Sequence, residues 1–297
     1  MKKEDLRKVS AVEDHRRLFK TLRYVYPVIS RRSGGLSLGV NLNPLRHCTF
    51  NCVYCEVDRS EPLPFETKDE RIDLDLLEQE LKSLIEQSQS GKLAEYPRFS
   101  DAPELTRGIK DIAFSGNGEP TLSPSFGEAV ERVGKIWHQL SQKPKPKTVL
   151  ITNASCLHLS GVLEAIKRMH QFNGEAWVKL DAGTEEYYHK MNVSKVSFDR
   201  ILGNILLVAE NLPIYIQSLF LKFNGTDISE TELELYCERL NEILSKGGVI
   251  RGVQAYTIAR PAYGPGADLL SGLSALELQK LAEVIRSRTG LSVETYA

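Results

Sequence analysis

The sequence has few cysteines, almost no net charge and no long apolar run. Five cysteines in 297 residues are too few, and odd in number, for a disulfide framework. No apolar run reaches the roughly 18 residues of a membrane-spanning helix, and the N-terminus lacks the apolar stretch of a signal peptide. A net charge of −1 argues against a strongly basic nucleic-acid-binding protein. We therefore expect a folded cytoplasmic protein with no membrane partner.

Positive charge is nevertheless concentrated at the start of the chain. The first 32 residues hold ten Lys or Arg and four Asp or Glu. This segment is either the solvated face of a helix or a surface for an anionic partner such as RNA. A chain of this length can form one large domain or two ordinary ones. We expect a basic helical extension over residues 1–35 and a single domain over residues 36–297.

Apolar strand-like runs alternate with amphipathic, helix-like runs. The predicted strands are 36–44, 109–116, 147–152, 176–181, 214–223, 249–258 and a short one at 291–296. The predicted helices are 72–89, 125–140, 159–169, 198–210, 229–244 and 274–288. Strands alternating with helices form a parallel sheet through right-handed crossovers. The sequence thus predicts an α/β fold, a partial (β/α)6 TIM-like barrel with an N-terminal helical extension.

In such a barrel, ligands bind at the carboxyl ends of the strands, so the residues that follow each strand are the candidates for function. One long segment between two repeats, 88–108, is polar, contains proline and lacks periodicity. It is typical of a surface insertion and could serve as a lid.

Three of the five cysteines follow the first predicted parallel strand. Cys48, Cys52 and Cys55 are separated by three and then two residues, while Cys156 and Cys237 stand apart. Three thiolates on one loop can bind one soft metal centre. A structural zinc site needs four protein ligands, whereas a [4Fe–4S] cluster on three cysteines keeps one iron open for another ligand.

The same loop carries a resemblance to a known family. The spacing Cys48-x-x-x-Cys52-x-aromatic-Cys55, with Tyr54 before the third cysteine, resembles the signature of the radical S-adenosylmethionine (SAM) superfamily. The resemblance implies a [4Fe–4S] cluster on the three cysteines and SAM on the open iron. It also implies reductive cleavage of SAM to a 5′-deoxyadenosyl radical, which abstracts a hydrogen atom from the substrate.

A second motif follows the next strand. Gly118, Glu119 and Pro120 lie in the run Ser-Gly-Asn-Gly-Glu-Pro. Glycine lets the backbone approach a ligand closely, and proline fixes the turn. The run resembles the superfamily's Gly-Glu-Pro motif, which implies that this turn receives the SAM amino group.

The third and fourth strands end in polar residues. The resemblance implies SAM ribose and carboxylate contacts at such strand ends, and Asn153 and Asp181 are the candidates in this sequence. The alternative is that their side chains form Asx-type caps or turns. Lys179 is two residues before Asp181 and shares its strand face. It is our catalytic candidate, as a substrate-binding or Schiff-base amine, with a salt-bridge partner as the alternative.

Polar residues also interrupt the fifth and sixth strands. Gln217 lies in one, and Gln254 and Tyr256 lie in the other. If these three side chains point inward, they could contact SAM or substrate, and Gln217 and Gln254 are the candidates for cofactor binding. The alternative is a polar residue at a strand end whose hydrogen bonds are satisfied within the protein. Arg260, which follows the sixth strand, could bind a carboxylate or phosphate through its guanidinium group or form a surface ion pair.

The motifs together resemble one branch of the superfamily, the wyosine tRNA-modifying synthases and related Fe–S oxidoreductases. Those synthases carry a second cluster on extra N-terminal cysteines, whereas this chain has no cysteine before Cys48. The resemblance implies an oxidoreductase or lyase type of enzyme and an electron donor similar to flavodoxin or ferredoxin. The substrate is an RNA base, for example in tRNA, or else a small molecule or peptide. A structural zinc or Fe–S interaction module is the alternative outside enzymology.

Overall fold

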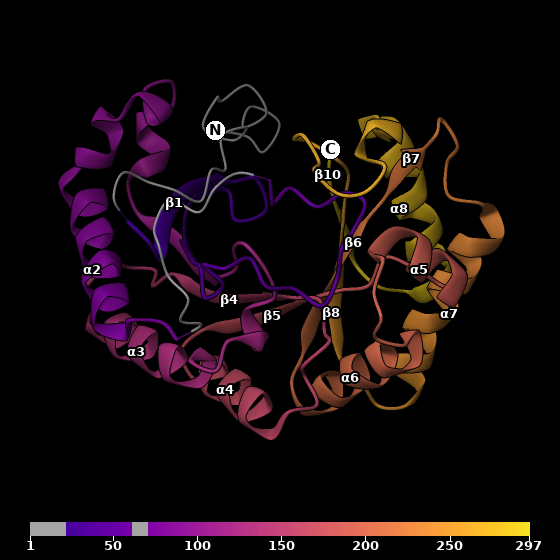
Figure 1. The fold of residues 1–297 in the computed structure, drawn as a ribbon, viewed down its shortest axis with the longest axis horizontal. Coiled ribbons are helices and arrows are strands. Elements are labelled where there is room, and N and C mark those ends of the chain that lie inside the picture. Colours follow the sequence, from indigo (N-terminus) through magenta and orange to yellow (C-terminus); the bar gives the residue numbers. More distant parts are fainter. Residues whose placement is uncertain (1–21, 61–70) are drawn as a thin grey trace. The chain divides into compact units, whose positions relative to one another are not determined.

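The computed structural model describes residues 22–60 and 71–297. Most of the expected helical extension, residues 1–21, lies outside the described residues (Figure 1). Two compact units form. Of the described residues, unit 1 comprises 22–47, 71–151 and 164–175, and unit 2 comprises 48–60, 152–163 and 176–297.

Strands and helices alternate as the sequence predicts. The strands are β1 (Val25–Ser30), β2 (Gly35–Val40), β3 (Ile109–Phe114), β4 (Lys147–Thr152), β5 (Gly174–Lys179), β6 (Ile214–Leu219), β7 (Leu221–Phe223), β8 (Ile250–Tyr256), β9 (Leu270–Gly272) and β10 (Val293–Tyr296). The α-helices are α2 (Leu74–Ser90), α3 (Phe126–Gln139), α4 (Ser160–His170), α5 (Glu185–Asn192), α6 (Phe198–Asn211), α7 (Glu230–Ser245) and α8 (Ala275–Thr289). Among the residues that the structure describes, no helix has the length and apolar character needed to cross a membrane.

Unit 1 places the loops after β2 and β3 next to each other. Its hydrogen-bonded strand order is β1-β2-β3-β4. Strand β1 pairs antiparallel with β2, whereas β2 with β3 and β3 with β4 are parallel. The carboxyl ends of β2 and β3 therefore share one edge of the sheet. Leu38 and Ile112 on these strands are fully buried. Helix α2 packs against β1 and α3, and its Leu77, Leu81 and Leu84 are buried.

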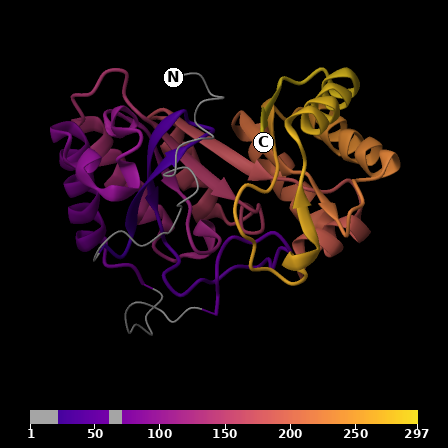
Figure 2. The same ribbon diagram turned by 90° about the horizontal axis from the view of Figure 1, so that it is seen from above.

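Unit 2 contains the remaining parallel strands. Its strand order is β5-β6-β8-β10, and every pair is parallel. Helix α8 packs against β8 and β10, and α7 packs against both α6 and α8 (Figure 2). The short strands β7 and β9 form a separate antiparallel pair.

The segment 88–108, which we expected to be a polar insertion or a lid, packs within unit 1. It contains three short 3-10 helices, η2 (Lys92–Glu95), η3 (Pro97–Phe99) and η4 (Pro103–Thr106). Leu93 and Phe99 are fully buried, and the Ser88 hydroxyl donates a hydrogen bond to the Thr106 carbonyl at 2.7 Å. These apolar anchors make the segment part of the core.

The start of the sheet differs from the sequence prediction. Strand β1 lies inside the expected extension over residues 1–35, so the sheet begins before residue 36. The buried carboxylate of Glu80 in α2 accepts hydrogen bonds from the backbone N–H groups of Arg23, Tyr24 and Val25 at 2.8, 2.8 and 3.1 Å. This single side chain attaches the entry of β1 to α2.

Candidate active site

Backbone hydrogen bonds attach the cysteine loop, residues 48–55, to helix α5. Asn51 N–H donates to the Asn192 carbonyl at 3.1 Å, and Val53 N–H donates to the Met191 carbonyl at 3.0 Å. These acceptors are the last two residues of α5. Val53 and Tyr54 also join a buried apolar cluster with Met191, Leu219 and Leu221. The loop is therefore fixed on the end of α5 and beside the end of β6.

The segment after β8, which contains Tyr263 and Gly264, covers this loop. Tyr263 N–H donates to the Cys55 carbonyl at 2.7 Å. A Cβ at Gly264 would lie 2.0 Å from the Cys52 carbonyl oxygen, so only glycine fits there. Arg260 forms an ion pair with Glu56 at 3.0 Å, which is one of the two outcomes expected for it. The segment after β8 thus closes over the cysteines, a role that no sequence pattern indicated for Gly264.

Each of the three cysteine sulfur atoms accepts a hydrogen bond from a side-chain N–H group. Asn153 Nδ2 lies 3.6 Å from Cys48 Sγ, and Asn192 Nδ2 lies 3.6 Å from Cys52 Sγ. Arg59 Nη1 lies 3.6 Å from Cys55 Sγ. None of the three cysteines forms a disulfide bond, and each residue is partly exposed.

The donor set suits an iron–sulfur cluster in its chemistry, since three thiols lie on one loop beside N–H groups that favour sulfur ligands. The geometry is not preassembled, however. In the described part of the chain, no group of three or more His, Cys, Asp or Glu side chains is arranged to hold a metal ion. This differs from the converged cysteines that the sequence led us to expect.

Burial raises the pKa of the Cys52 thiol to about 11, although the Lys179 charge and hydrogen bonds from Asn192 and Tyr54 oppose this shift. The thiol is therefore protonated at neutral pH in the metal-free chain. Because a metal binds the thiolate, metal binding would release this proton.

Asp181 is the centre of a buried polar cluster directly after β5. Its Oδ1 accepts a hydrogen bond from Leu219 N–H at 2.9 Å. Its Oδ2 accepts hydrogen bonds from the Tyr54 hydroxyl and from Asn192 Nδ2, the latter at 2.9 Å. Burial, followed by the Asp181 charge, raises the pKa of Tyr54 well above its usual range. Tyr54 therefore remains a hydrogen-bond donor, and Asp181 links the cysteine loop to the ends of β5 and β6.

Lys179 lies beside this carboxylate. Its ammonium is 3.8 Å from Asp181 Oδ2 and donates a hydrogen bond to the Tyr256 hydroxyl. It also lies over the rings of Tyr54 and Tyr256, at 4.8 and 5.1 Å from their centroids. Burial opposes the charge, but Asp181, Tyr256 and Cys52 outweigh it and raise the pKa of Lys179 above its ordinary value. Lys179 is thus a fixed cation, in the ion pair that was one expectation for it.

Lys179, Gln217 and Gln254 form one row across three strands. In the sheet register Lys179 is opposite Gln217, and Gln217 is opposite Gln254. Gln217 Nε2 donates to Gln254 Oε1 at 2.8 Å, and both side chains are buried. The structure therefore brings these three predicted residues together with Asp181, and we name Lys179, Asp181, Gln217, Gln254 and Tyr256 the polar row.

The loop that carries Asp181 is fastened to α7. Glu232 accepts hydrogen bonds from Gly183 N–H at 2.6 Å and from Thr184 N–H at 3.1 Å. It also accepts one from the Thr184 hydroxyl at 2.6 Å. A Cβ at Gly183 would lie 2.1 Å from the Tyr236 nitrogen. Sequence reasoning missed Glu232, which is an ordinary first-turn carboxylate by pattern.

The predicted Gly-Glu-Pro turn lies in unit 1. A Cβ at Gly118 would lie 1.9 Å from the His47 carbonyl oxygen. Glu119 N–H donates to that carbonyl at 3.1 Å, and Asn43 Nδ2 donates to the Glu119 carbonyl at 2.6 Å. The Glu119 carboxylate accepts hydrogen bonds from Thr121 N–H and hydroxyl at 3.1 and 2.6 Å. It thereby caps the 3-10 helix η5 (Pro120–Leu122), and the turn is held against the loop after β2.

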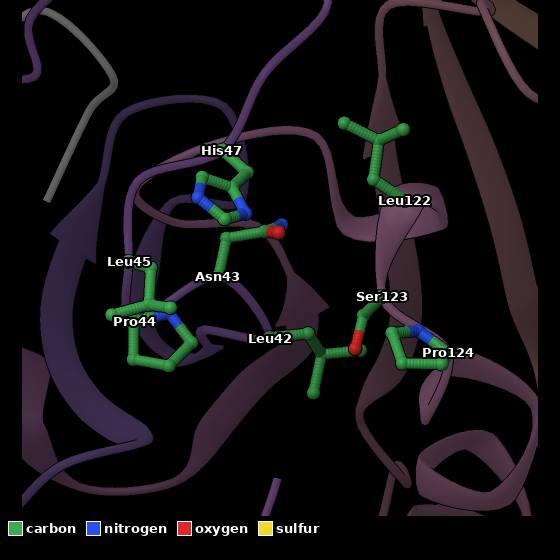
Figure 3. Close-up of a pocket in the computed structure, with 8 residues that line it drawn as sticks. All are labelled: Leu42, Asn43, Pro44, Leu45, His47, Leu122, Ser123 and Pro124. Carbon is green, nitrogen blue, oxygen red and sulfur yellow. The ribbon is translucent and has the colours of Figure 1, made fainter. Parts of the chain in front are cut away.

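A small cavity lies beside this turn. Its volume is about 140 Å³, well below the roughly 300 Å³ of the smallest ligand pockets that enclose a drug-sized molecule. Figure 3 shows Asn43 and His47 on one side of it, with Leu122, Ser123 and Pro124 opposite. The space suits one small group and not a whole cofactor.

The chain is similar to known proteins at a distance. No family model matches it. It is 26% identical over 225 residues to a UPF0026 protein of Helicobacter pylori strain J99, covering 73% of this chain and 61% of that protein. The corresponding UPF0026 protein of strain 26695 is 26% identical over 239 residues, covering 80% of this chain and 66% of that protein. The chain thus spans about three fifths to two thirds of the length of these relatives.

A solved structure confirms the fold class. A radical SAM methyltransferase from Sphaerobacter thermophilus aligns with a TM-score of 0.57 at 13% identity, covering 92% of this chain and 68% of that one. The chain therefore has the α/β partial TIM-like barrel fold that the sequence predicted. The wyosine-synthase branch is not confirmed by these similarities.

Proposed function

We propose that this chain is a radical SAM enzyme whose [4Fe–4S] cluster is held by Cys48, Cys52 and Cys55. The observation that carries the proposal is the placement of these three cysteines. They lie on one loop, each sulfur faces a side-chain N–H donor, and Asn192 and Tyr54 connect the loop to Asp181. The fold shared with a radical SAM methyltransferase supports it.

When bound, the cluster and SAM supply one-electron cleavage of SAM and hydrogen abstraction from a substrate. The chain's own residues bind and orient the ligands. We assign to Lys179 the binding of an anionic group, such as a carboxylate, because its charge is fixed beside Tyr256. Gln217 and Gln254 offer amide groups in the same row for neutral polar groups.

Other residues exclude water and hold the loop. Gly264 permits the segment after β8 to lie on the Cys52 carbonyl, which shields the cysteine loop from solvent on that side. Asp181 holds Tyr54 and Asn192 in place through one carboxylate oxygen. We keep Gly118, Glu119 and Pro120 as the proposed site for the SAM amino group and Asn153 as a proposed SAM contact.

The test is cluster content. We expect the anaerobically reconstituted chain to bind about four iron and four sulfide ions per chain, and Cys52→Ala to lose most of both. Cys237→Ala is the matched control, because Cys237 is buried in α7 and should leave the cluster content unchanged. A colourless chain that binds only zinc would overturn the proposal and favour a structural interaction module.

We further propose a substrate and an electron donor. The basic first 32 residues support an RNA base, for example in tRNA, as substrate, and the proposed cluster requires a donor similar to flavodoxin or ferredoxin. Binding to total tRNA should weaken with added salt, because each phosphate contact releases counterions, and should weaken when residues 1–32 are removed. Absent or salt-insensitive binding would favour a small molecule or peptide substrate.

A further inference from the structure

Two asparagines approach the cysteine loop from separate elements. Asn153 comes directly after β4, and Asn192 is the last residue of α5. Their side chains are 5% and 2% exposed. Each directs its amide N–H to a different cysteine sulfur, Cys48 and Cys52, at the same distance of 3.6 Å.

The Asn192 amide is shared among several acceptors. In addition to Cys52 Sγ, it donates to the Tyr54 hydroxyl oxygen at 2.9 Å and to Asp181 Oδ2 at 2.9 Å. Its backbone carbonyl accepts from Asn51 N–H. One residue therefore holds the loop backbone, the Cys52 sulfur and the Asp181 carboxylate together.

The Asn153 amide is oriented by hydrogen bonds with Thr49 and Ser155. Its Oδ1 accepts a hydrogen bond from Ser155 N–H at 3.0 Å, and its Nδ2 donates to Thr49 Oγ1 at 3.0 Å as well as to Cys48 Sγ. The Thr49 hydroxyl donates to Ser155 Oγ at 2.8 Å. The amide is consequently fixed with its N–H side toward the sulfur.

Hydrogen bonds to the sulfur ligands are one of the factors that set the reduction potential of an Fe–S cluster, and outer partners orient the ligands themselves. An N–H donor stabilises the state with more negative charge on sulfur, which is the reduced cluster. We propose that Asn153 and Asn192 are positioning residues that orient Cys48 and Cys52 and raise the potential of the cluster. The inference rests on the proposed function and adds a second role to Asn153, for which we expected a SAM contact.

The substitution that isolates this role is Asn→Leu, because it keeps most of the side-chain volume and removes the N–H donor without adding a charge. Asn153→Leu is the first variant. Asn192→Leu also removes a donor to Asp181 and is the second variant. Asn211→Leu is the matched control, because Asn211 also ends a helix, α6, but is exposed and donates to the Leu207 carbonyl.

The experiment measures the midpoint potential of the reconstituted full chain by spectroscopically monitored redox titration without SAM. We expect Asn153→Leu and Asn192→Leu to lower the ratio of reduced to oxidised cluster about tenfold at a fixed solution potential, about 59 mV for a one-electron couple. Asn211→Leu should match the wild type. A role of Asn153 as a SAM contact alone would leave this potential unchanged.

The outcomes separate the two proposals. A wild-type chain without a cluster contradicts the proposed function itself. A wild-type chain with a cluster, together with an unchanged potential in Asn153→Leu, overturns only this inference. If Asn192→Leu keeps its circular dichroism spectrum but binds fewer iron ions than Asn211→Leu, the positioning role is supported. If Asn192→Leu does not fold, the potential of Asn153→Leu decides between the outcomes.

Discussion

The hydroxyl of Tyr54 donates a hydrogen bond to the carboxylate of Asp181, although the two residues are 127 positions apart. Tyr54 belongs to the cysteine loop, and Asp181 follows β5. This contact makes the cysteine loop and the polar row one buried network within unit 2. The network predicts how individual substitutions will act.

Asp181→Ala should destabilise the chain strongly. It removes the acceptor of Leu219 N–H and Tyr54 and leaves the Lys179 ammonium without its carboxylate. Breaking a buried charged pair from one side costs about 3–5 kcal/mol. Urea denaturation measures the free energy of unfolding, with Asp199→Ala on the exposed face of α6 as control. A loss below about 1 kcal/mol would show that Asp181 is not the centre of the network.

Gly264→Ala should displace the segment that covers the cysteine loop. The added Cβ would lie 2.0 Å from the Cys52 carbonyl oxygen, and backbone atoms must move to relieve the clash. We expect a loss of roughly 1–3 kcal/mol and faster reaction of the cysteines with a thiol reagent. Gly203→Ala in α6 is the control, because nothing lies within 4 Å of its Cβ position. Equal thiol reactivity in both variants would contradict the covering role.

Lys179→Gln should weaken the binding of an anionic ligand. The substitution removes the fixed cation beside Tyr256 while keeping most of the side-chain length. With SAM as the probe, we expect equilibrium dialysis to show an affinity at least about tenfold lower, which corresponds to about 1.4 kcal/mol. Lys246→Gln, at the exposed end of α7, is the control. If SAM binds both variants with the wild-type affinity, Lys179 does not bind this ligand.

Alkaline pH should destabilise the metal-free chain partly through Cys237. Burial raises the pKa of this thiol from 9.0 to about 11, so the folded state retains the proton that the unfolded state loses. Its contribution to stability is fully present below pH 9 and is lost as pH rises toward 11, at roughly 1.4 kcal/mol per pKa unit. The melting temperature of Cys237→Ala should therefore fall less than that of the wild type between pH 9 and 11. If the melting temperatures of the two proteins fall equally between pH 9 and 11, Cys237 does not contribute to the loss of stability.

The sequence could predict the six strand–helix repeats because their apolar residues follow clear strand and helix periods. The strand predicted at 147–152 has the same bounds as β4. Strand β1 was missed because it contains Pro27 and follows a basic segment. It ends the strand order of unit 1, and such an edge position tolerates proline.

The cysteine loop could be predicted from its spacing, and four other residues from their positions in or after strands. Lys179 and Asp181 lie at the end of a strand, and Gln217 and Gln254 interrupt apolar strands. The structure places these four residues in one network. Asn192 was missed because helix α5 was missed. Its sequence, Glu-Glu-Tyr-Tyr-His-Lys-Met-Asn, lacks an apolar period, so nothing indicated that its last residue would return to the cysteine loop.

The most direct test of the central claim is the release of 5′-deoxyadenosine. The anaerobically reconstituted chain is incubated with SAM and dithionite, and the nucleoside is measured by chromatography. The wild type and Cys237→Ala should release it, and Cys52→Ala should reduce the release to background. Release that survives in Cys52→Ala, or none from a wild-type chain that holds a complete cluster, would contradict the account.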